Sequence, residues 1–287
     1  MKEIAMTSKS IATEFKLKSP ITKQDEQDSK TPLIPKAANV SHVSLQENPK
    51  IKPKVDYLVN DTDAKSQVAM FELEKSGIET SSIIKLLSAG LLGLKKNRKL
   101  VPTRWAITAT DDTLSKEKLK RIKLFPEISE FLVFHAEYVG NHYEFLLLPD
   151  KFSFEVIERS LKSGGSWHDY ETFFPRKRYA ESVTGAYYVN RLALCEYLER
   201  VKRQAQCIVF REVRPEYYAP LGVGILRETS RAAFSQQPEK FASLNEALQS
   251  IQSRLKQPLI NYTSQSVLLS LLGKQKRITD FFKNSTR

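Results

Sequence analysis

The sequence predicts a mixed α/β fold, with one globular domain between a loose N-terminal arm and a short C-terminal tail. Three observations predict it. Apolar residues make up 41% of the 287 residues, enough for a substantial core. Segments with helical and strand periodicity alternate along the chain. Residues 1–53 are rich in Ser, Thr, Lys, Gln and Pro and nearly lack aromatics, so they are expected to stay loose. The predicted boundaries are 1–53, 54–272 and 273–287.

The first half of the predicted domain is mainly helical. Asn60–Asp63 offers capping side chains before a helix that ends at Gly77, and a second helix runs from about residue 80 to residue 90. Trp105–Ala109 has the apolar character of a buried strand. Asp112 or Thr113 then caps a basic helix that runs to about residue 123.

The second half alternates strands and helices. A hairpin over 131–139 and 143–148 turns at Gly140-Asn141. The expected order after it is a helix over 152–161, a loop containing Trp167 and Pro175, a long helix over 184–204, strands over 206–213 and 221–226, and helices over 244–255 and 265–272.

The net charge favours a polyanionic partner, for which nucleic acid is the obvious candidate. The chain has 45 Lys and Arg against 33 Asp and Glu, which gives +12 and an isoelectric point near 9.5. Two blocks are basic: 95–124 holds ten basic and three acidic residues, and 174–231 holds eleven and six. Between them, 125–172 holds three basic and nine acidic residues. Ordinary solvated helix faces are the alternative explanation for each block.

Composition also argues against several classes of protein. The two cysteines and four scattered histidines lack structural-zinc spacing, so no metal site and no disulfide framework are expected. The absence of a signal core and of any long apolar stretch predicts a cytoplasmic protein without a membrane role. Cys195 and Cys207 are interpreted as small buried hydrophobes. His135, His142 and His168 are interpreted as satisfied or solvent-facing histidines. The alternative is a general base, but none of the three has a visible nucleophile or metal partner.

The C-terminal tail carries the most specific motif. Gln275 is followed by Ile278 three positions on and by the aromatic pair Phe281-Phe282 three further. This pattern resembles the clamp-binding box (PIP motif) through which replication and repair proteins dock on the sliding clamp, PCNA. The resemblance implies that Ile278, Phe281 and Phe282 enter an apolar pocket of the clamp while Gln275 occupies a polar notch. A last amphipathic turn that folds back on its own domain is the alternative.

Five longer segments together resemble the archaeal Nre family of DNA-repair proteins. They are Leu58–Ala64, Leu86–Leu94, Asn97–Trp105, Gly185–Ala193 and Phe210–Glu228. Members of that family typically end in a clamp-binding box, so the resemblance implies a DNA-repair role with PCNA as partner. They usually also carry a further N-terminal portion with a cysteine-rich zinc-finger segment. This chain has no such cysteines and resembles the C-terminal part of a full-length member.

Candidate residues for contacts with DNA or a nucleotide are basic. Arg98, Lys99 and Arg104 precede the predicted strand, whose far end carries Asp111 and Asp112, so a phosphate and a divalent cation could bind at opposite ends. A basic surface loop followed by a helix cap is the alternative.

Arg191 lies on the apolar stripe of the long helix, where a guanidinium needs a carboxylate or a bound anion. We expect Glu212 or Glu228 to be the carboxylate. Arg211 is the remaining candidate cation, because it stands next to Glu212 near the end of a strand.

The sequence leaves three functions open. The first is a DNA-repair accessory protein that is recruited to the clamp by its tail and contacts DNA or a nucleotide through its basic domain. The second is an enzyme, a hydrolase or transferase acting on nucleic acid or nucleotides. It would gather Arg98, Arg104, Asp111, Asp112, Arg191 and Glu212 in one pocket. The third is a non-catalytic adaptor that binds only proteins. No common catalytic motif is present, and no cofactor is indicated.

Overall fold

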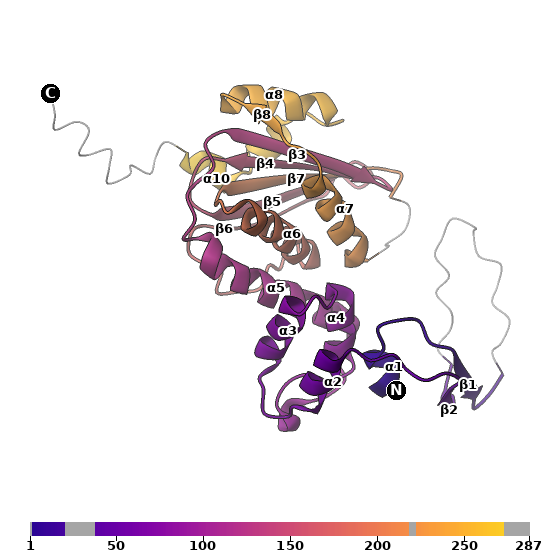
Figure 1. Ribbon diagram of the computed structural model, residues 1–287. Helices are drawn as coiled ribbons and strands as arrows, with labels where there is room; N and C mark the ends of the chain where they lie inside the picture. The colour runs from indigo at the N-terminus through magenta and orange to yellow at the C-terminus, as the bar shows by residue number, and fades with distance from the viewer. Residues whose placement is uncertain (1, 21–37, 218–221, 273–287) are drawn as a thin grey trace. The chain divides into compact units, whose positions relative to one another are not determined.

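The computed structural model describes residues 2–20, 38–217 and 222–272 (Figure 1). It has a mixed α/β fold, as predicted. The described residues form two compact units, an N-terminal unit that runs to Glu117 and a C-terminal unit that begins at Lys118. In the described part of the chain, no helix has the length and apolarity needed to cross a bilayer.

The N-terminal unit is mainly helical. Its elements are α1 (Lys2–Met6), β1 (Thr13–Leu17), β2 (Val40–Leu45), α2 (Pro53–Asn60), α3 (Ser66–Lys75), α4 (Thr80–Ser88), the 3₁₀ turn η1 (Lys95–Asn97) and most of α5 (Thr103–Ile122). Strands β1 and β2 pair antiparallel, and α1 buries Ala5 and Met6. The described parts of the segment expected to be loose therefore contain regular structure.

Glycines end the two helices at the predicted places. Gly77 follows α3 with φ +71°, and Gly90 follows α4 with φ +70°. A Cβ atom on Gly90 would lie 2.6 Å from the carbonyl carbon of Lys99, so both the backbone angle and the close approach require glycine. The predicted cap of α3 is wrong. Asp61 accepts the backbone N–H groups of Asp63 and Ala64 in a turn, and Lys65 occupies the N-cap position.

The predicted strand at Trp105–Ala109 is wrong, because α5 runs without interruption over Thr103–Ile122. Ala106, Thr110 and Leu114 are buried at a spacing of four, which is a helical and not an alternating pattern. The predicted cap at Asp112 or Thr113 lies inside this helix.

The C-terminal unit contains a six-stranded mixed sheet in the order β6-β5-β7-β4-β3-β8. The strands are β3 (Phe131–Tyr138), β4 (Asn141–Leu148), β5 (Ser153–Ser160), β6 (Ser166–Glu171), β7 (Gln206–Val213) and β8 (Glu239–Phe241). Strands β5 and β7 pair parallel, and the other neighbours pair antiparallel. The β3–β4 hairpin confirms the prediction, with Gly140 in the turn at φ +70°.

Helices cover both faces of this sheet (Figure 1). On one face lie α6 (Gly185–Val201) and α7 (Val223–Ser235), where Phe134 of β3 packs edge-on against Tyr197 and in a tilted arrangement against Phe234. On the other lie α8 (Leu244–Arg254), α9 (Ile260–Thr263) and α10 (Val267–Leu271). Ile251 of α8 belongs there to the same apolar cluster as Phe210 of β7. The long helix, the strand over 206–213 and the helix over 244–255 are confirmed.

Three predictions for this unit are wrong. The expected helix over 152–161 is strand β5, the expected strand over 221–226 falls largely in helix α7, and the expected loop around Trp167 contains strand β6. The physical reason for the first error is burial on both sides. Phe154 and Val156 face the α6 side, whereas Glu155 and Ile157 face the α10 side, so no polar stripe marks the strand.

Candidate functional site

The predicted clamp-binding residues Gln275, Ile278, Phe281 and Phe282 lie outside the described residues. The structure does describe the place from which the tail departs, helix α10. Its first turn is held by the buried carboxylate of Glu155, which accepts the N–H of Val267 at 2.7 Å and the hydroxyl of Ser266. Glu155 also contacts Nε2 of His168 on β6 at 2.7 Å. The first turn of α10 therefore lies on β5, whereas Leu272, at the far end of the helix, lines a pocket with Leu244 and Leu248 of α8.

Among the basic candidates of the N-terminal unit, Arg98 has a structural role. Its guanidinium group donates hydrogen bonds to three backbone carbonyls, those of Gly93 at 2.7 Å, Val59 at 2.6 Å and Asp61 at 2.5 Å. These bonds hold the turn after α2 against the loop after α4. The N–H donors of Arg98 are thus used in hydrogen bonds within the protein.

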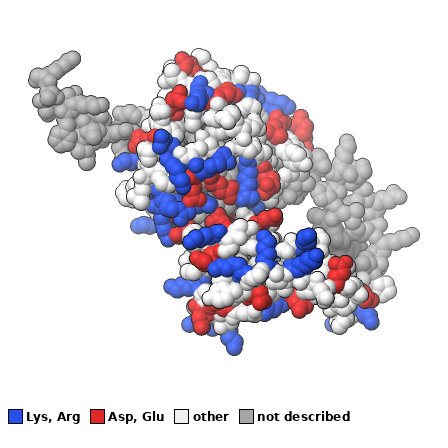
Figure 2. All heavy atoms as spheres, in the orientation of Figure 1, with Lys and Arg blue, Asp and Glu red and all other residues white. Residues whose placement is uncertain are grey.

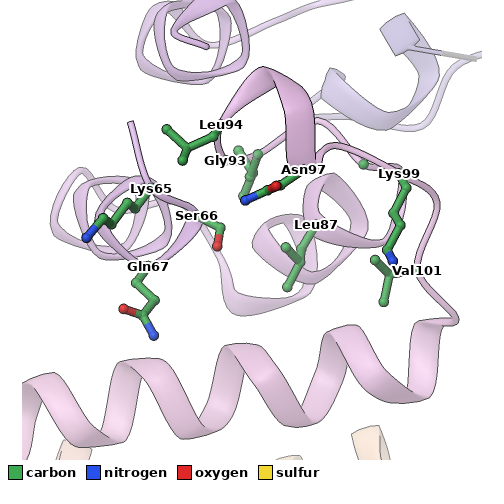
Figure 3. A pocket seen from close by; sticks show the side chains of 11 residues that line it. Lys65, Ser66, Gln67, Leu87, Gly93, Leu94, Asn97, Lys99 and Val101 are labelled. Atoms are coloured by element: carbon green, nitrogen blue, oxygen red, sulfur yellow. The ribbon is translucent and has the colours of Figure 1, made fainter. Parts of the chain in front are cut away.

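Lys99 lines a pocket of about 330 Å³ in the N-terminal unit (Figure 3). Ser66 and Gln67, from the first turn of α3, face Leu87 of α4 across it, with Lys65 and Lys99 on opposite sides. The N-cap residue Lys65 makes no side-chain capping bond. N–H groups at a helix start beside two lysines can donate hydrogen bonds to an anionic oxygen, such as one of a phosphate.

Arg104 is exposed at the start of α5, and its guanidinium carbon lies 6.0 Å from the ring centre of Trp105. Trp105 is itself 54% exposed.

The acidic candidates on the same helix do not form a metal site. Asp111 is fully buried, and Asp112 pairs with Lys116 at 2.7 Å. No grouping of three or more His, Cys, Asp or Glu side chains suited to a metal ion occurs among the residues described.

Arg191 forms a buried ion pair, but not with the predicted partner. Its Nη1 atom lies 3.0 Å from Oε1 of Glu171 on β6, and both side chains are 1% exposed. Glu212 lies on the opposite face of the sheet, where it accepts the N–H groups of Lys256 and Gln257 and contacts Arg214 at 2.9 Å. Glu228, the other predicted partner, contacts Arg231 instead. The set proposed for the enzyme hypothesis is therefore not gathered in the C-terminal unit.

Arg211 also has internal partners. Its guanidinium contacts Glu158 at 2.9 Å and donates to the side-chain oxygen of Asn141. Its Nε atom, the hydroxyl of Tyr143 and the amide nitrogen of Asn190 are buried without a hydrogen-bond partner among the described residues. Burial raises the pKa of Tyr143 although Arg211 opposes the rise, so this hydroxyl stays protonated as a donor. Ordered water or a ligand oxygen ordinarily satisfies such donors.

The histidines and cysteines have the structural surroundings that were predicted. His135 lies 3.5 Å from Glu239, and His142 lies 2.9 Å from the buried Glu144. Cys195 and Cys207 are buried, and burial raises the pKa of both thiols.

The sequence reasoning missed a surface that spans both sides of the edge strand β6. It includes the loop after that strand, Lys123 after α5 and Lys151 between β4 and β5. We call it the aromatic–basic surface. Its members are Tyr170, Phe173, Phe174, Tyr179, Lys123, Lys151, Lys177 and Arg178. The four aromatic side chains are exposed by more than a third, and Phe174 by 76%. The signal was the run from Phe173 to Tyr179, in which aromatic residues flank three cations.

The comparisons with known proteins agree with the resemblance seen in the sequence. The family model described as "Archaeal Nre, N-terminal" matches residues 1–167, and "Archaeal Nre, C-terminal" matches residues 171–281. No solved structure matches.

Similar relatives include two proteins from Archaeoglobus fulgidus. "DNA repair protein NreA" is 35% identical over 98% of this chain and 71% of the relative, and "DNA repair protein NreB" is 34% identical over 98% and 73%. "DNA repair protein NreA" from Haloferax volcanii is 33% identical over 88% of this chain and 62% of the relative. The chain therefore belongs to the archaeal Nre family.

Proposed function

We propose that this protein is a DNA-repair factor that docks on the sliding clamp, PCNA, through Gln275, Ile278, Phe281 and Phe282. The observation that carries the proposal is the C-terminal sequence itself, an amide, an aliphatic side chain and two aromatics in the spacing of a clamp-binding box. Membership of a family whose relatives are named DNA repair proteins supports it. The C-terminal family match reaches residue 281, so the motif falls almost wholly within the matched region.

The energetics favour a weak tether. Full burial of Ile278, Phe281 and Phe282 contributes roughly 6 kcal/mol at about 2 kcal/mol per side chain. Ordering of the tail on binding costs about 2–5 kcal/mol. The motif alone thus gives modest affinity, and a second contact to DNA at the clamp raises the effective affinity by avidity.

The second contact is proposed to be with DNA. Of the five candidate cations, Arg98, Arg191 and Arg211 are engaged by internal partners, whereas Lys99 and Arg104 are exposed. We assign the phosphate contact of the N-terminal unit to Lys99 and Arg104, with the exposed Trp105 next to Arg104. Because phosphate contacts release counterions, DNA affinity should fall steeply as salt is raised, whereas a pure protein adaptor has no such affinity.

Capture by the immobilised clamp of the same organism tests the docking step. The variant Ile278→Ala/Phe281→Ala/Phe282→Ala and a chain ending at Lys274 should both lose capture. Asn284→Ala/Ser285→Ala, in the same tail but outside the motif, should be retained like the wild type. Thermal unfolding of each variant checks that the units remain folded. Undiminished capture of the triple variant would contradict the proposal.

A further inference from the structure

We infer that the aromatic–basic surface binds the unpaired bases of single-stranded DNA. Its aromatic members stack on bases and its cations contact the phosphates. The choice of DNA over RNA rests on the proposed repair function, whereas the stacking itself rests on the geometry of this surface alone.

The aromatic side chains are placed where they face solvent. Phe173 and Phe174 pack edge to face, with ring centres 5.8 Å apart, and Phe174 is the more exposed of the two, at 76% against 37%. Tyr170 stacks on His168 at 5.7 Å, and Tyr179 stacks on Tyr188 at 5.3 Å. Large exposed rings in one short segment are unusual on a protein without a partner, because each gains free energy on burial. Nucleobases are partners with matching flat faces.

The loop that carries these rings is fixed by Arg176. Its guanidinium donates to the carbonyls of Tyr170 at 2.8 Å and Tyr179 at 3.1 Å, and it pairs with Asp169 at 2.8 Å. Asp169 in turn accepts the N–H of Val183 at 2.7 Å, just before α6. Both ends of the loop are therefore anchored at one point. The rings are held in place before binding, which lowers the entropy that a ligand must offset.

The outward charge of the surface is positive. Lys123 Nζ lies 4.7 Å and Lys151 Nζ 5.8 Å from the ring centre of Phe173, and Lys177 and Arg178 are exposed. The neighbouring carboxylates Asp169 and Glu171 are buried and paired with Arg176 and Arg191. Glu171 also interacts with Lys123, whereas Lys151, Lys177 and Arg178 are exposed. Figure 2 shows many Lys and Arg side chains on the viewed face, with Asp and Glu side chains among them.

This combination fits a single strand better than a duplex or a protein. A duplex keeps the faces of its bases stacked inside the helix, whereas a single strand presents them. The cores of protein–protein interfaces are depleted in lysine, and here two lysines lie over the central ring, Phe173. Phosphates along the strand complement the exposed Lys177 and Arg178.

Fluorescence anisotropy of the full chain with a labelled mixed-sequence 20-nucleotide DNA tests the inference. Tyr170→Ala and Phe174→Ala should each weaken binding by about fivefold or more, the loss expected for one stacked base. Lys177→Ala/Arg178→Ala should lower the slope of log affinity against log salt by about 1.4. Tyr57→Ala is the matched control, because Tyr57 is 63% exposed and has Lys54 5.5 Å from its ring centre in the other unit. It should bind like the wild type.

Three results would overturn the inference: unchanged affinity of both aromatic variants, equal or tighter binding of the same sequence as a duplex, or equal or tighter binding of the same sequence as RNA. Circular dichroism should show an unchanged fold for Phe174→Ala, since that side chain is largely exposed. The aromatic variants should still be captured by the clamp, so failure of this inference is distinguishable from failure of clamp docking. Loss of clamp capture in Phe174→Ala would reassign the surface to protein binding and would also overturn the inference.

Discussion

The buried pair between Arg191 and Glu171 offers the sharpest test of how the C-terminal unit is held together. Glu171→Gln keeps the shape of the side chain and an acceptor for the N–H of Arg176, which donates to Glu171 at 3.2 Å. It removes the charge opposite a guanidinium that is 1% exposed. An uncompensated buried charge costs about 3–5 kcal/mol. The variant is therefore expected to lose about that much free energy of unfolding.

A neighbouring lysine adds to this loss. Burial lowers the pKa of Lys123, and Glu171 is the first of the charges that offset this effect. Neutralising Glu171 should therefore lower the pKa of Lys123 further and leave two cations without their common counter-charge. At about 2–4 °C per kcal/mol, the melting temperature should fall by roughly 6–20 °C.

Urea unfolding followed by tryptophan fluorescence measures the effect in the correct unit. The chain has two tryptophans, Trp105 in the N-terminal unit and Trp167 on β6, so a Trp105→Phe background reports the C-terminal unit alone. The control is Glu196→Gln, which breaks a half-exposed pair with Arg231 at 2.7 Å and should cost less than about 1 kcal/mol. A similarly small loss in Glu171→Gln would refute the reasoning.

Two further predictions concern thiols and acid. Because burial raises the pKa of Cys195 and Cys207, a thiol reagent at pH 8 should label neither in the folded protein and both in urea, and rapid labelling without urea would contradict this. Burial raises the pKa of Glu199, but hydrogen bonds and charge from Lys118 and Arg121 outweigh it, so the net pKa is lowered. A lowered carboxyl pKa contributes stability that is full above the unfolded value of about 4.5 and is lost as pH falls through the folded value. In Glu199→Gln, the free energy of unfolding should thus fall less steeply as the pH is lowered below about 5. The same pH dependence as in the wild type would exclude this contribution.

Local signals predicted the elements that have local causes. The β3–β4 hairpin was predicted because Gly140 supplies a positive φ between two apolar runs, and α4 because a helical stripe ends at Gly90. Strand β5 was not predicted because it contains buried charged residues. Glu155 and Glu158 look like the polar side of a helix in the sequence, but one caps α10 and the other pairs with Arg211. Those partners lie far along the chain, so periodicity could not reveal them.

The same limit applies to the site residues. That Arg191 needed a carboxylate followed from its place on an apolar stripe, but its partner Glu171 lies on a strand that the sequence suggested was a loop. Arg98 was selected for its charge, yet its three carbonyl partners come from the C-terminal end of α2 and from the loop after α4. Charge alone cannot distinguish a cation that is hydrogen-bonded within the protein from one that is available to bind a phosphate. Burial and hydrogen-bond partners make that distinction.

The two proposed contacts belong to the same C-terminal unit and the tail that follows it. Helix α10 packs on β5, and Glu155 ties its first turn to His168 of β6, the strand that leads into the aromatic–basic surface. Gln275 follows the last residue of α10, Leu271, by four positions, a span of at most about 14 Å. Docking of the motif would therefore hold the C-terminal unit close to the clamp, which encircles DNA. A short tail between the clamp and the domain raises the local concentration of single-stranded DNA near the aromatic–basic surface. Two weak contacts, stacking and the motif, then act together in recruitment.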